Sequence, residues 1–168
     1  MKAAIITISD SAHRGEREDR SSPVIEKLLK RIDADVAARA TVPDEVNDIV
    51  RAVKRAAKEA DVVVTTGGTG VSPRDVTPEA VRKVIEKELP GFGEAMRAAG
   101  LKSTPHAILS RSLAGVMKDG TVVICLPGSP RAVEESLLAV LDAVPHCVEV
   151  SKGRASECAR KRQPRKRS

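Results

Sequence analysis

Continuous apolar runs alternate along this chain with segments whose apolar residues recur at helical spacing. The runs predict buried strands at residues 3–8, 62–65 and 121–126, a more polar strand at 36–42, and a last short strand at 147–150. Residues 25–32, 46–57 and 133–141 have the period of helices with one buried face. Strand–helix alternation of this kind favours a largely parallel sheet covered by helices on both faces. The pattern therefore predicts an α/β protein.

The stretch from residue 88 to residue 111 departs from this alternation. Pro90 and Gly91 interrupt one helical pattern, and residues 93–99 predict a shorter helix. Residues 105–110 are then expected to be extended. A segment inserted between two strand–helix units can contribute to a binding site or to an oligomer contact.

A hydroxyl residue followed by proline appears three times after a predicted strand, as Ser22-Pro23, Thr77-Pro78 and Ser129-Pro130. Such pairs are typical of a helix N-cap followed by the first helical position. Parallel strands end at one edge of their sheet, where ligands bind. We therefore expect residues 9–11, 65–70 and 126–130 to converge on one crevice. The simpler alternative is that these pairs only start helices.

The composition limits the kinds of function. The chain has 168 residues, a length typical of a single domain with its own core. It has no Trp and no Tyr, and its single Phe is Phe92, so the core must be aliphatic. Single-strand nucleic-acid modules stack bases on aromatic side chains, so this class is nearly excluded.

The positive net charge is confined to the end of the chain. Residues 151–168 carry eight Lys and Arg against Glu157, a charge of +7 within a total of +6, so the remainder carries −1. We interpret residues 1–150 as the domain and residues 151–168 as a basic, disordered, solvated tail. The alternative is a weak electrostatic hold on nucleic acid or another polyanion.

Cysteine usage and hydropathy favour a cytoplasmic protein. Cys125, Cys147 and Cys158 have no metal-ligand spacing, and the first two lie in apolar stretches expected in the core. No apolar run approaches a membrane span, and we expect no signal peptide because a strand begins near Lys2. The histidines, at positions 13, 106 and 146, also lack ligand spacing.

The segment 65–80, Thr-Thr-Gly-Gly-Thr-Gly-Val-Ser-Pro-Arg-Asp-Val-Thr-Pro-Glu-Ala, has the composition of an anion-binding loop. Bare backbone N–H groups, hydroxyls and a helix start all favour negative charge. It is not a Walker A loop, because Gly70 is not followed by Lys and a hydroxyl residue. Pro73 excludes the dinucleotide fingerprint. A glycine-rich turn without a ligand remains the alternative.

Two aspartates are expected near this loop. Asp44 follows a predicted strand and precedes a helix, and Asp75 lies within the loop itself. Each could simply cap a helix. Two carboxylates facing a polyphosphate would repel it unless Mg²⁺ lies between them, and Mg²⁺ commonly uses one or two carboxylates plus phosphate oxygens.

Several of these motifs, in this order, resemble the MoaB/MogA family of molybdenum cofactor biosynthesis. The resemblance covers about residues 2–150 and rests on these segments: residues 65–70, 73–79 (Pro-Arg-Asp-Val-Thr-Pro-Glu), 90–97 (Pro-Gly-Phe-Gly-Glu-Ala-Met-Arg), 109–111 (Leu-Ser-Arg) and 126–130 (Leu-Pro-Gly-Ser-Pro). It implies the molybdopterin-binding fold, a three-layer α/β/α arrangement around a mixed, mostly parallel sheet. It also implies a homotrimer or hexamer and a partner that inserts molybdenum.

The family's active members are adenylyltransferases. The terminal phosphate of molybdopterin attacks the α-phosphorus of ATP and pyrophosphate leaves. A phosphate monoester is largely dianionic near pH 7, so no general base is needed, and alignment and charge neutralisation must supply the catalysis. The alternative is a non-catalytic, MoaB-type molybdopterin-binding oligomer, which the compact length favours. The presence of both Asp44 and Asp75 favours the active type.

The resemblance also assigns the site residues. Asp44 and Asp75 are expected to be catalytic and to bind Mg²⁺. The loop residues expected to contact phosphate or pterin are Gly67, Gly68, Thr69 and Gly70. The other residues expected to line the pocket are Ser9, Asp10, Glu94, Ser110, Arg111, Pro127, Gly128 and Ser129.

Overall fold

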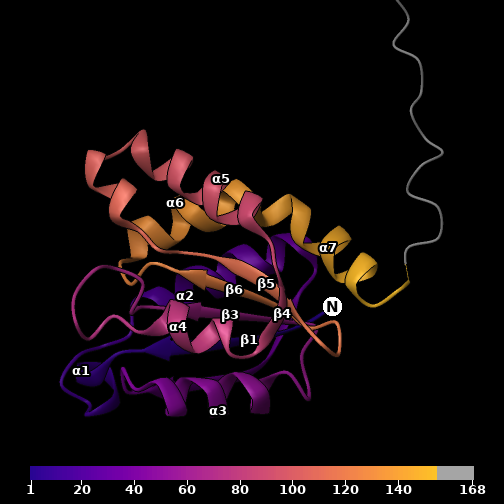
Figure 1. The fold of residues 1–168 in the computed structure, drawn as a ribbon, viewed down its shortest axis with the longest axis horizontal. Helices are drawn as coiled ribbons and strands as arrows, with labels where there is room; N and C mark the ends of the chain where they lie inside the picture. The colour runs from indigo at the N-terminus through magenta and orange to yellow at the C-terminus, as the bar shows by residue number, and fades with distance from the viewer. Residues whose placement is uncertain (155–168) are drawn as a thin grey trace, which may run out of the picture.

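The computed structural model describes residues 1–154 and contains one sheet (Figure 1). The sheet has six strands in the order β2-β1-β3-β6-β5-β4. The strands are β1 (Lys2–Ile8), β2 (Asp35–Val42), β3 (Val62–Thr66), β4 (Ile85–Glu88), β5 (Ala114–Met117) and β6 (Val122–Leu126). Strands β2, β1, β3 and β6 pair in parallel. Strand β5 is antiparallel to both of its neighbours, β6 and β4. The sheet is therefore mixed and mostly parallel, as the sequence predicts.

Helices cover both faces of this sheet, which gives the three layers. The α-helices are α1 (Asp10–His13), α2 (Ser21–Leu29), α3 (Val46–Ala56), α4 (Thr77–Arg82), α5 (Pro90–Leu101), α6 (Pro130–Val140) and α7 (Val144–Ser151). Three 3-10 segments accompany them: η1 (Lys30–Ile32), η2 (Pro105–Leu109) and η3 (Leu141–Ala143). One face packs against α2, α5, α6 and α7, and the opposite face against α3 and α4 (Figure 1).

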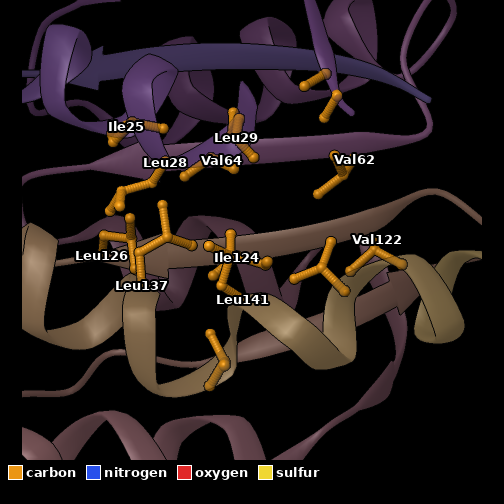
Figure 2. Close-up of a cluster of buried hydrophobic side chains, with 14 of the residues drawn as sticks. Ile25, Leu28, Leu29, Val62, Val64, Val122, Ile124, Leu126, Leu137 and Leu141 are labelled. Atoms are coloured by element: carbon orange, nitrogen blue, oxygen red, sulfur yellow. The ribbon is translucent and has the colours of Figure 1, made fainter. Parts of the chain in front are cut away.

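The core is aliphatic on both faces. Successive side chains of a strand point to opposite faces, so Val62 and Val64 of β3 face one cluster while Val63 faces the other. In Figure 2, Val64 and Ile124 lie in the first cluster with α2 and α6 side chains. The residues from these helices labelled there are Ile25, Leu28, Leu29 and Leu137. Phe92 only packs at the margin of this cluster.

Three expectations from the sequence are wrong. Residues 147–150 lie in α7 and not in a strand, because Val144 and Val148 are one helical turn apart and both are buried. Residues 105–109 form η2, whose start is capped by the Thr104 hydroxyl, so they are not extended. Pro90 lies in the first turn of α5 and interrupts no helix, because the element before it is strand β4.

The last described helix, α7, runs to Ser151. The basic tail proposed for residues 151–168 falls, from residue 155 onward, outside the described residues, and so does Cys158. Within residues 1–154, none of the helices combines the length and the apolar character that crossing a membrane requires.

Candidate active site

The loops that follow β1, β3 and β6 meet at the carboxyl edge of the parallel strands. The N–H of Gly67 donates to the carbonyl of Leu126 at 3.2 Å, and the Thr66 hydroxyl donates to the carbonyl of Pro127 at 2.7 Å. The N–H of Ser9 donates to the carbonyl of Val42 at 3.0 Å, which adds the end of β2. The crevice expected from chain order is therefore present.

Two cavities open at this edge, and they share one wall. The first has a volume of about 480 Å³ and lies between the glycine loop, α5, η2 and α6. The second has a volume of about 470 Å³ and lies between the loop after β1, the start of α2 and Asp44. The residues common to both cavities are Gly68, Asp75, Gly128 and Ser129. Two molecules bound in the two cavities would thus meet beside Asp75.

The start of the glycine loop requires glycine for steric reasons. Gly67 has φ +101°, and a Cβ there would lie 2.2 Å from the carbonyl oxygen of Ile8. Gly68 has φ +63°. L-residues with a side chain rarely adopt such φ values, so both glycines are needed for this turn.

Replacing Gly67 by alanine is expected to destabilise the fold by about 2 kcal/mol or more, because strain and a backbone collision add together. Urea unfolding monitored by far-UV circular dichroism measures this. Gly15→Ala is the matched control, since Gly15 has φ +74° with nothing within 4 Å of its Cβ position. Equal losses in the two variants would show that the collision with Ile8 contributes nothing.

The two predicted aspartates lie directly against the glycine loop. A Cβ on Gly68 would be 3.0 Å from Oδ1 of Asp44 and 2.4 Å from the hydroxyl of Thr77. A Cβ on Gly70 would be 2.9 Å from Oδ2 of Asp75. The absence of side chains at these glycines is what lets the loop and both carboxylates come together.

Asp44 is held by Asp10 and does not cap a helix. The N–H of Asp10 donates to Oδ2 of Asp44 at 2.9 Å, and the N–H of Asp44 donates to Oδ1 of Asp10 at 3.1 Å. The N-cap of α3 is Glu45, which makes no side-chain capping bond. The reciprocal pair fixes the orientation of the Asp44 carboxylate and leaves its Oδ1 beside Gly68.

Asp75 is likewise not a helix cap. Its Oδ2 accepts the N–H of Ser72 at 2.8 Å, which closes a tight turn within the loop. The N-cap position of α4 belongs to Val76. Within residues 1–154, no hydrogen bond reaches Oδ1 of either Asp44 or Asp75.

The donor set fits a magnesium ion that is completed by phosphate. The described residues contain no group of three or more His, Cys, Asp or Glu that could hold a metal alone. Asp44 and Asp75 instead offer one free carboxylate oxygen each, and Mg²⁺ is typically bound by one or two carboxylates together with substrate phosphates and water.

The electrostatics of these acids differ. Burial raises the pKa of Asp44 above its ordinary value, and the charges of Asp10 and Asp75 add to this effect. Hydrogen bonds from the Asp44 backbone and from Arg74 lower the pKa of Asp10. The Arg74 guanidinium donates hydrogen bonds to both carboxylate oxygens of Asp10 at 2.9–3.1 Å and to Glu45 at 2.9 Å. Arg74 therefore connects the glycine loop to the loops after β1 and β2.

Most of the other predicted residues lie around the two cavities. The first cavity is lined by Thr69, Gly70, Ser110, Pro127, Gly128 and Ser129. The second is lined by Ser9, Gly67, Gly68, Gly128 and Ser129. Asp10 lines neither cavity and exchanges backbone-to-carboxylate hydrogen bonds with Asp44. Glu94 is exposed on α5 and outside both linings, and Arg111 lines a third, smaller cavity of about 270 Å³.

Of the three hydroxyl–proline pairs, Ser129 alone caps its helix, accepting the N–H of Ala132 at 3.3 Å. Thr77 donates its hydroxyl to the carbonyl of Gly67 at 2.8 Å and so supports the glycine loop. Ser22 lies inside α2, whose first N–H groups are accepted by Asp19. A hydroxyl before proline does not by itself identify the N-cap, because a nearby carboxylate competes for the same N–H groups.

Residues 17–21 and the apolar wall of the first cavity are part of the site but were not predicted from the sequence. The charged residues after β1 enter the second cavity, and Met96, Ala107 and Leu109 enter the first. The charged run 14–20, directly after a strand, and the irregular stretch 88–111 were the available signals.

Asp19 organises the floor of the second cavity. It accepts the hydroxyls of Thr7 and Ser22, each at 2.5 Å, and the backbone N–H groups of Ser21 and Ser22. Burial raises the pKa of Asp19, but the hydrogen bonds from Ser22 and Thr7 outweigh it, so the pKa lies below its ordinary value.

Replacing Asp19 by asparagine is expected to cost about 1–3 kcal/mol at pH 7, because an amide cannot accept from both hydroxyls and both N–H groups. A lowered pKa means that the ionised form stabilises the fold above the ordinary pKa and that this stabilisation is lost as the pH falls through the folded value. The gap between wild type and variant in urea unfolding should therefore shrink below pH 4. A gap independent of pH would contradict this account.

The comparisons with known proteins agree with the fold and identify the family. Residues 4–146 match the family described as "Probable molybdopterin binding domain". A molybdopterin adenylyltransferase from Helicobacter pylori is 42% identical over 153 residues, which cover 89% of this chain and 86% of that protein.

Solved structures of related proteins have the same fold. The molybdopterin biosynthesis enzyme MoaB from Thermus thermophilus has a TM-score of 0.84 and 43% identity, covering 90% of this chain and 96% of its own. A MoaB from Pyrococcus furiosus, described as a tungsten cofactor synthesizing protein, has a TM-score of 0.83 and 37% identity, covering 90% and 96%.

Proposed function

This chain belongs to the molybdopterin-binding family that its residues 4–146 match, and from that membership we propose that it acts in molybdenum cofactor biosynthesis as a molybdopterin adenylyltransferase. The reaction transfers AMP from ATP to the terminal phosphate of molybdopterin and releases pyrophosphate. The two cavities that meet at Asp75 are the observation that carries this proposal, because two substrates must bring their phosphates together.

The chemical character of each cavity supports an assignment of the substrates. Apolar side chains, among them Val71, Met96 and Leu109, line much of the first cavity, which suits the flat ring system of a pterin. The second cavity contains Asp44 and is rimmed by Arg17 and Arg20, which suits a nucleotide triphosphate with its metal ion. The pterin phosphate then enters from one side of Asp75 and the α-phosphorus of ATP from the other.

The glycine loop supplies donors for phosphate oxygens. Among the described residues, the N–H of Gly67 donates to Leu126, whereas the N–H groups of Gly68, Thr69 and Gly70 have no acceptor. Successive free N–H groups in a turn form a concave anion site. Gly68 lies on the wall shared by the two cavities, and Thr69 and Gly70 line the first cavity, so these N–H groups are placed where negative charge would gather during the transfer.

The residues of this chain contribute alignment and neutralisation of charge. The pterin phosphate is itself the nucleophile and is largely dianionic near pH 7, so it needs no general base. Asp44 and Asp75 would hold Mg²⁺ through their free Oδ1 atoms. When bound, the ion would neutralise the triphosphate and stabilise the leaving pyrophosphate.

The experiment is incubation of the full chain with molybdopterin, ATP and Mg²⁺, followed by chromatography of the pterin. Adenylylated pterin and an equal amount of pyrophosphate are expected. Pterin binding without product would instead support the non-catalytic, MoaB-type role. The proposal extends to a homotrimer or hexamer and to a molybdenum-inserting partner, both of which rest on the family alone.

A further inference from the structure

Arg111 contacts the main chain of the glycine loop at several points. Its Nε donates to the carbonyl of Gly70 at 2.7 Å, and its Nη2 donates to the carbonyl of Asp75 at 2.5 Å. Its Nη1 pairs with Glu79 of α4, and its backbone N–H donates to the carbonyl of Thr69 at 2.9 Å. All three guanidinium nitrogens are therefore engaged.

These contacts join the two ends of segment 70–75, which carries Asp75. The planar guanidinium fork has a fixed shape, so it sets the separation between the carbonyls of Gly70 and Asp75. Within the segment, Oδ2 of Asp75 is already bonded to Ser72 and packs against Gly70. The direction of the free Oδ1 thus depends on the backbone that Arg111 holds.

A second arginine supports the first. Arg97 of α5 donates through Nη1 to the carbonyls of Ser112, at 3.0 Å, and Ser110, at 3.4 Å. These two residues flank Arg111. A Cβ on Gly93 would lie 3.1–3.2 Å from the Arg97 guanidinium and 2.8 Å from the carbonyl of Ser112, so Gly93 leaves room for this contact. Helix α5 therefore anchors the short segment from which Arg111 projects.

We propose that Arg111 is a positioning residue for the adenylyl transfer: it holds segment 70–75 in the shape that directs Asp75 at the junction of the two cavities. This rests on the proposed function, and it replaces direct substrate contact as the role of Arg111. Arg111 is absent from the linings of both substrate cavities, and Glu79 balances its charge.

The test compares Arg111→Lys, Glu79→Gln and the double variant with wild type. Lysine keeps the charge but cannot bridge two carbonyls and Glu79 at once. We expect Arg111→Lys to lower kcat by about 10–100-fold, with a smaller change in KM for pterin and for ATP. Glu79→Gln, at an exposed residue outside both cavities, should lower kcat several-fold, and the double variant should be no worse than Arg111→Lys.

The matched controls are Arg82→Lys and Glu88→Gln. This pair also joins α4 to a neighbouring segment through an exposed ion pair, at 3.2 Å, but makes no contact with the glycine loop. Its variants should keep kcat within about twofold of wild type, since such pairs contribute little.

Hydrogen exchange provides a readout that does not need turnover. Amides of residues 70–76 should exchange faster in Arg111→Lys than in wild type, and the control variants should leave them unchanged. A rise in KM that exceeds the loss in kcat, or unchanged exchange at residues 70–76, would overturn the positioning role. Absence of turnover in the wild type would refute the proposed function instead, and the exchange data would then decide by themselves whether Arg111 holds the loop.

Discussion

Replacing Asp75 by asparagine is expected to lower adenylyl transfer by at least about 10³-fold while leaving pterin affinity within a few-fold of wild type. Asp75 lies on the wall shared by both cavities, and its Oδ1 is free to bind a metal ion. Asparagine can still accept the N–H of Ser72, so the loop should keep its shape. The loss would then come from charge and metal binding and not from unfolding.

Single-turnover formation of adenylylated pterin measures the rate, and a separate titration measures pterin binding. Asp142→Asn is the control, because Asp142 is exposed in η3 and lies outside both cavities. Normal turnover by Asp75→Asn would remove the metal-binding role. A parallel loss of pterin affinity would show that the residue binds the pterin directly.

Asp44→Asn should separate function from stability. We expect transfer to fall by about 10²–10³-fold, because one of two metal-binding carboxylates is lost. The variant should nevertheless be at least as stable as wild type near pH 7. Burial and the neighbouring acids raise the pKa of Asp44, so its ionised form is disfavoured in the folded state.

The sign of the linkage makes this testable. An acid with a raised folded pKa destabilises the fold above that pKa and stops doing so once the pH falls below its ordinary value. In urea unfolding, the free energy of unfolding of Asp44→Asn relative to wild type should therefore be higher at pH 7 than at pH 3. A variant that is markedly less stable at pH 7 would mean that Asp44 is needed for the fold.

The long or strongly patterned elements of this fold could be predicted from the sequence, and the short strands β4 and β5 could not. Strands β1, β3 and β6 are continuous apolar runs because helices cover both of their faces. Strand β4 is short and largely exposed at the sheet edge, so it has no apolar signature. The valines of α7 predict a strand, wrongly, because a short apolar run does not distinguish a strand from a helix.

The same division applies to the site. Asp44, Asp75 and the glycine loop belong to local sequence motifs, and the structure brings them together at one sheet edge. The pairing of Asp10 with Asp44, the cradle around Asp19 and the bonds from Arg111 join residues distant in the chain. Periodicity and spacing carry no information about such contacts, so these contacts could be identified only from the structure.

The most direct test of the proposed transfer uses two preparations of ATP, one labelled at the α-phosphorus and one at the γ-phosphorus. With molybdopterin, Mg²⁺ and the full chain, the α-label should appear in the pterin product and the γ-label in pyrophosphate. This result requires attack of the pterin phosphate at the α-phosphorus of ATP. Absence of the α-label from the pterin, or entry of the γ-label into it, would contradict the account.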